Sequence, residues 1–92
     1  MTPIEHREFV GRNFMLLREA LGLRPKDFAD RLGITMSGLW NIEAGRSYPG
    51  PMTLYRATQE FGITADWLIR GSRAGLPNDM ARTLLERERE QA

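Results

Sequence analysis

The 92-residue chain carries 13 basic and 12 acidic side chains, one histidine and no cysteine. This length suits one small domain, and the lack of cysteine excludes disulfides, thiolate metal sites and cysteine nucleophiles. No carboxylates cluster around the single histidine, so we predict neither a metal site nor a cofactor. No apolar run approaches the ~18 residues of a membrane span, and the polar N-terminus does not resemble a signal peptide, so we expect a cytoplasmic protein.

Charge is distributed unevenly along the chain, although the formal net charge is only +1. The segment Leu23–Arg56 holds five basic and three acidic residues, whereas Asp79–Glu90 holds three basic and four acidic residues. A mildly basic middle favours nucleic acid as the partner there, and the acidic-leaning end favours another role.

The first predicted element is a long helix that begins near residue 3. Thr2-Pro3-Ile4-Glu5 has the pattern of a capping box, with proline at the first helical position. We interpret His6 as a surface residue of this helix. Apolar residues then recur at near-helical spacing until Gly22, namely Ile4, Val10, Phe14, Leu17 and Leu21.

Two short helices are predicted next, over about residues 25–32 and 36–44, and they meet at a sharp turn. Gly33 can adopt the left-handed conformation that ends a helix, and Thr35 is a strong N-cap for the following helix. Their inner faces carry Phe28, Ala29 and Leu32, then Leu39 and Ile42. Two helices joined by three or four residues, the second polar on one side, are typical of the helix-turn-helix that enters the DNA major groove.

Turn residues and further short helices fill the remainder of the chain. Arg46–Pro51 is predicted as a loop, and a helix over about residues 52–61 turns Leu54, Ala57 and Phe61 inward. Thr64 then caps a short helical segment that holds Trp67, Leu68 and Ile69, and we assign Trp67 to the core. Arg73–Pro77 is a predicted linker, and Asn78 is predicted to cap a last helix. No strand pattern occurs, so the expected fold class is all-α.

This succession of motifs resembles the Cro and lambdoid phage repressor type of helix-turn-helix domain, also described as XRE-like. The matching motifs are Gly22-Leu23, Phe28-Ala29, Leu32-Gly33-Ile34-Thr35, Leu39, Ile42-Glu43, Gly45, Pro49, Thr53-Leu54, Phe61-Gly62-Ile63, Asp66-Trp67-Leu68-Ile69 and Gly71. The resemblance implies a compact five-helix DNA-binding domain over residues 1–71, with a linker and an additional C-terminal helix over residues 72–92. It also implies that a dimer binds a pseudo-palindromic operator in double-stranded DNA.

By this resemblance, the outward face of the helix over residues 36–44 reads bases. The implied base contacts are Met36, Ser37, Trp40 and Asn41. Asparagine can pair with adenine N6 and N7, which makes Asn41 the leading candidate. Met36 and Trp40 form an adjoining apolar stripe that reaches thymine methyl groups or, alternatively, packs against the Arg46–Pro51 loop on Tyr48.

Side chains at the helix ends are implied to hold phosphates, which position the protein without reading sequence. They are Arg24, Lys26, Thr35, Arg46 and Ser47, and the alternative for each basic residue is an ordinary solvated charge. The resemblance further implies a largely buried ion pair between Arg18 and Glu43. Two features depart from the family: Pro25 stands where glutamine commonly holds phosphate, and the helix itself carries no lysine or arginine.

The leading hypothesis is a sequence-specific DNA-binding transcriptional regulator, most simply a repressor. The alternative is a protein-interaction module on the same fold, antitoxin-like or antirepressor-like, that uses the Met36 and Trp40 face. The sequence lacks catalytic triads, metal-ligand spacing and glycine-rich phosphate loops, so we do not expect an enzyme. The last helix is predicted to support dimerisation through Met80, Leu84 and Leu85; alternatively these three dock on the domain's own core, or residues 73–77 begin a linker to a further domain.

Overall fold

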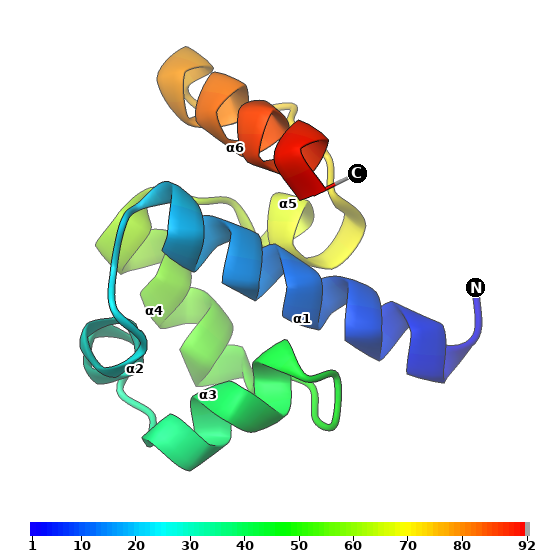
Figure 1. The fold of residues 1–92 in the computed structure, drawn as a ribbon, viewed down its shortest axis with the longest axis vertical. Coiled ribbons are helices and arrows are strands. Elements are labelled where there is room, and N and C mark those ends of the chain that lie inside the picture. The colour runs from blue at the N-terminus through cyan, green and yellow to red at the C-terminus, as the bar shows by residue number, and fades with distance from the viewer. Residues whose placement is uncertain (92) are drawn as a thin grey trace.

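A computed structural model describes residues 1–91 and shows six α-helices without strands in that range, which confirms the all-α fold class. The helices are α1 (Pro3–Ala20), α2 (Pro25–Leu32), α3 (Met36–Glu43), α4 (Pro51–Phe61), α5 (Ala65–Arg70) and α6 (Asn78–Gln91). In Figure 1, α1 runs across the domain, with α2, α3 and α4 on one side of it and α5 and α6 on the other.

The capping residues predicted from the sequence begin and end these helices. Thr2 Oγ1 accepts a hydrogen bond from the Glu5 backbone N–H at 3.1 Å, and the Thr2 N–H donates to the Glu5 carboxylate at 2.9 Å. This backbone bond from Thr2 lowers the pKa of Glu5, because it stabilises the carboxylate. Gly33 ends α2 with a φ of 74°, and Thr35 caps α3 through a 3.0 Å bond from the Gly38 N–H. The sharp turn between α2 and α3 is therefore confirmed.

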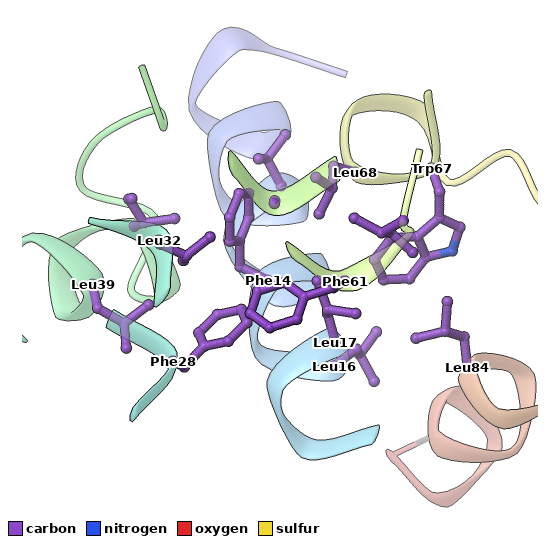
Figure 2. Close-up of a cluster of buried hydrophobic side chains, with 14 of the residues drawn as sticks. Phe14, Leu16, Leu17, Phe28, Leu32, Leu39, Phe61, Trp67, Leu68 and Leu84 are labelled. Atoms are coloured by element: carbon purple, nitrogen blue, oxygen red, sulfur yellow. The ribbon is translucent and has the colours of Figure 1, made fainter. Parts of the chain in front are cut away.

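One hydrophobic core joins all six helices. Phe14 and Leu17 of α1 lie at its centre, and the rings of Phe28 and Phe61 stack with centroids 5.2 Å apart (Figure 2). Trp67 is fully buried, as predicted, although its indole N–H has no partner within the described chain. Most other predicted inward residues are also buried, namely Val10, Ala29, Leu32, Leu39, Ile42, Ala57 and Leu68.

A few sequence-based assignments are wrong in detail. Ile4 is exposed, because the first turn of α1 extends beyond the helices that cover the rest of it. Helix α3 ends at Glu43, one residue earlier than expected, and α4 begins one residue earlier, at Pro51. Asn78 is the first residue of α6 and not its cap, because the Pro77 carbonyl already accepts the Ala81 N–H at 2.9 Å.

The last helix, α6, packs on α1 and completes the core. Leu84 is fully buried and points from α6 toward Leu16 and Trp67 (Figure 2), so the prediction that it contacts a second subunit is wrong. Met80 is partly buried against the same core, and Leu85 is partly buried. The far end of α6 is held by an Arg73–Glu88 ion pair and by a 2.7 Å hydrogen bond from Gln91 to Glu19.

Between residues 1 and 91, no helix combines the length and apolar character required to cross a membrane.

Candidate nucleic-acid interface

An ion pair fixes α3 to α1. Arg18 Nε lies 2.9 Å from Glu43 Oε2 and Arg18 Nη2 lies 3.1 Å from Glu43 Oε1, in a two-pronged arrangement. The two side chains are only 15% and 6% exposed. The hydrogen bonds that Arg18 donates to Glu43 raise the pKa of Arg18, because they stabilise the charged guanidinium. The pair links the last turn of α1 to the end of α3, as the resemblance implied.

The two helices also approach each other backbone to backbone. A Cβ atom at Gly11 of α1 would lie 2.3 Å from the carbonyl oxygen of Ile42, so only glycine allows the observed crossing. Further along the crossing, Arg7 Nε donates to the Gly45 carbonyl at 2.7 Å. The direction of α3 is therefore set by several contacts with α1 along its C-terminal half.

The outward face of α3 differs along its length. Ser37 is exposed, and 44% of Trp40 is exposed. Met36 and Asn41 are partly buried, and Met36 packs against the core. The expected apolar stripe is thus reduced mainly to Trp40. Tyr48, the expected packing partner of that stripe, lies beside His6, with ring centroids 5.6 Å apart and ring planes inclined at 46°.

His6 is not the simple surface residue predicted from the sequence. Its side chain is partly buried, with Nδ1 2.9 Å from the Tyr48 hydroxyl and Nε2 2.8 Å from the Ile69 carbonyl. It therefore ties the start of α1 to the loop before α4 and to α5. No local sequence pattern predicts this role of His6, because its two partners lie 42 and 63 positions away in the chain.

The cations at the start of α2 lie on the surface, and each has an acidic neighbour. The side chains of Arg24 and Lys26 are 83% and 74% exposed. Arg24 pairs with Asp27 and Lys26 pairs with Asp30, both at 3.0 Å. Exposed pairs of this kind contribute little to stability, so both cations can exchange these partners for others.

The C-terminal end of α3 brings three candidate residues together. Arg46 Nε donates to Asn41 Oδ1 at 3.0 Å, and the Arg46 and Ser47 backbone N–H groups both donate to the Asn41 carbonyl, at 2.9 and 3.2 Å. Thr35 lies at the other end of α3, where its hydroxyl oxygen already caps the helix. Sequence reasoning proposed Asn41 and Arg46 separately and did not find that they are bonded to each other.

Two short helices joined by a glycine turn, the second held at a fixed angle with one face exposed, define a helix-turn-helix domain. The chain matches the helix-turn-helix domain family over residues 11–73 and belongs to that family. The resemblance found in the sequence is thereby confirmed.

A relative of this chain occurs in Bacillus subtilis (strain 168). The SPbeta prophage-derived uncharacterized HTH-type transcriptional regulator YonR is 31% identical over 64 residues, which cover 70% of this chain. The aligned region spans 59% of the length of that relative. No solved structure shows significant similarity to this chain.

Proposed function

We propose that this protein is a sequence-specific DNA-binding transcriptional regulator that acts as a repressor. Helix α3 enters the major groove, and a homodimer occupies a pseudo-palindromic operator. The observation that carries the proposal is the construction of α3: its end is bonded to α1 through Glu43, while Ser37 and Trp40 face solvent. A rigid helix with an open polar face is what groove recognition requires.

The start of α2 supports the same proposal. Pro25, the first residue of α2, has no N–H, but no side chain caps this helix N-terminus, so the backbone N–H groups of Lys26 and Asp27 remain available to an anion. Arg24 and Lys26 lie beside it with exposed side chains. We propose that these groups hold one phosphate of the DNA backbone, and that Thr35, Arg46 and Ser47 hold phosphates near the two ends of α3.

The name of the Bacillus subtilis relative also supports this proposal, since that protein is described as a transcriptional regulator. Exposure of Trp40 favours a second candidate, a protein-interaction module that uses this face. That candidate is weaker, because Met36 packs partly against the core and leaves a small apolar surface.

Salt dependence separates the two candidates. DNA affinity is expected to fall linearly on a log–log plot against salt concentration, with a slope of about −0.9 for each phosphate neutralised. Lys26→Ala is expected to make this slope shallower by about 1, measured by fluorescence anisotropy with labelled duplex. The control is Arg82→Ala on α6, which lies far from α2 (Figure 1). The Arg82 side chain is 69% exposed, close to the 74% of Lys26, and its removal should leave the slope unchanged. Binding that is indifferent to salt would contradict the proposal.

The two tryptophans provide a direct test of the α3 surface. Trp67 is fully buried, whereas 44% of Trp40 is exposed, so acrylamide should quench mainly Trp40. A saturating amount of duplex DNA is expected to protect Trp40 from the quencher, because groove binding covers it. Trp40→Phe should remove the quenchable emission and leave that of Trp67. If DNA binds and the quenching of Trp40 does not change, α3 is not the contact surface.

A further inference from the structure

The hydrogen bond between Arg46 and Asn41 restricts what Asn41 can recognise. An asparagine amide offers both an acceptor oxygen and an N–H₂ donor, and both are needed to pair with adenine. Here Arg46 Nε donates to Asn41 Oδ1 at 3.0 Å. A guanidinium has no acceptor, so the amide oxygen must face Arg46 and the N–H₂ group must face away from it.

The backbone holds the two residues in this relation. The Arg46 N–H donates to the Asn41 carbonyl at 2.9 Å, one turn after α3 ends, and the Ser47 N–H donates to the same oxygen at 3.2 Å. The loop is thus folded back over Asn41. The backbone bonds of this fold-back bring the exposed Arg46 side chain beside that of Asn41.

The rest of the α3 surface also offers more donors than acceptors. The indole of Trp40 can only donate, and the remaining Arg46 N–H groups are donors. Glu43 is the one carboxylate on α3, but it is bonded to Arg18 and is 6% exposed. The Thr35 hydroxyl oxygen is engaged by the Gly38 N–H. Ser37 can act as donor or acceptor.

We propose, as an extension of the DNA-binding function proposed above, that the Asn41–Arg46 pair reads guanine and discriminates against adenine. In the major groove, guanine presents two acceptors, N7 and O6, whereas adenine presents N7 together with the N6 amino donor. The outward Asn41 N–H₂ group and the free Arg46 N–H groups match guanine. Adenine shares the N7 acceptor, but it places an amino donor at position 6, where the donors of the pair require an acceptor. In this arrangement the Arg46 guanidinium contacts the base and not a phosphate, so Arg46 is a specificity-determining residue that acts both directly and by orienting Asn41.

The experiment is selection of bound duplexes from a random pool at moderate salt, with the wild type and with three variants. Asn41→Ala identifies the base position that Asn41 contacts, because its preference is lost there. The wild type is expected to select guanine at that position. Arg46→Ala is expected to shift the preference toward adenine, because it frees Asn41 Oδ1 to accept from the adenine amino group. Arg56→Ala is the matched control, since Arg56 donates to the Arg31 carbonyl and not to α3.

Modified bases test the same contact without changing the protein. Replacing the selected guanine by 7-deazaguanine, which lacks the N7 acceptor, should weaken wild-type binding by roughly 5- to 150-fold. Hypoxanthine keeps N7 and O6 and should bind as guanine does. If 7-deazaguanine binds as tightly as guanine, the proposed contact is refuted, and this measurement does not depend on whether Arg46→Ala folds.

The possible failures are distinct. Wild-type selection of adenine at the Asn41 position, or an unchanged preference in Arg46→Ala, overturns the guanine assignment while DNA binding stands. The guanine assignment is also overturned if Asn41→Ala changes the base preference at no position of the selected site. If the wild type enriches no duplex at all, the DNA-binding function itself fails.

Discussion

Glu43→Ala is expected to lower the free energy of unfolding by about 3–5 kcal/mol, because it leaves the charge of Arg18 largely buried without a partner. The Arg18 side chain is only 15% exposed and its guanidinium bonds both Glu43 oxygens. For a domain of this size, that loss corresponds to a fall in Tm of more than ~10 °C. Thermal unfolding followed by circular dichroism measures it.

Two further variants make the result interpretable. Asp66→Ala removes the exposed Asp66–Arg70 pair, and it should change the free energy of unfolding by less than about 1 kcal/mol. The double variant Arg18→Met with Glu43→Leu should recover much of the loss, since it leaves no buried charge. A Tm of Glu43→Ala within error of the wild type would mean that the bridge does not hold α3.

Gly11→Ala is expected to lower the free energy of unfolding by about 2 kcal/mol, since overpacking a close contact typically costs about 1–3 kcal/mol. The added Cβ would lie 2.3 Å from the Ile42 carbonyl oxygen and 3.1 Å from that of Glu43. Both atoms belong to the backbone of α3, so α1 and α3 must separate to admit it. Urea unfolding at equilibrium measures the change.

Gly38→Ala is the matched control, because Gly38 also lies inside a helix and gains the same helix propensity from alanine. Its Cβ would meet the Thr35 hydroxyl oxygen at 3.3 Å, which can shift slightly, and the Ile34 Cβ at an ordinary contact distance of 3.7 Å. We expect the stability of Gly38→Ala to stay within about 1 kcal/mol of the wild type. If Gly11→Ala is as stable as Gly38→Ala, the close crossing of α1 and α3 does not limit the fold.

The helix ends and the inner faces could be predicted from the sequence because their signals are local. A capping threonine, a glycine after the last turn and apolar residues at helical spacing each act within a few positions. Thr2, Thr35 and Gly33 show this directly, since each caps or ends the helix it was expected to.

The contacts between distant segments could not be predicted in this way. Leu84 and His6 illustrate two opposite errors: an apolar residue on a polar helix was assigned to a dimer interface, and a lone histidine to the surface. Leu84 fills the core beside α1, and His6 bridges three elements. Burial and hydrogen-bond partners depend on how helices distant in the chain pack together, and local sequence patterns do not reveal that packing.

The candidate interface could be predicted from the sequence only in part. The sequence pointed to Asn41 as a residue that pairs with adenine, on the chemistry of its side chain alone. The structure adds that Arg46 engages its oxygen, and a neighbour of this kind changes which base the same amide fits.

In helix α3, the residues that pack against the domain differ from those that face solvent. Leu39, Ile42 and Glu43 attach it to the domain, whereas Ser37 is exposed and 44% of Trp40 faces solvent. Under the proposed function, new target preferences can therefore arise by exchanging the solvent-facing residues while the residues that hold α3 stay unchanged. Substitutions at these exposed positions are expected to leave the free energy of unfolding nearly unchanged, so the fold tolerates variation there.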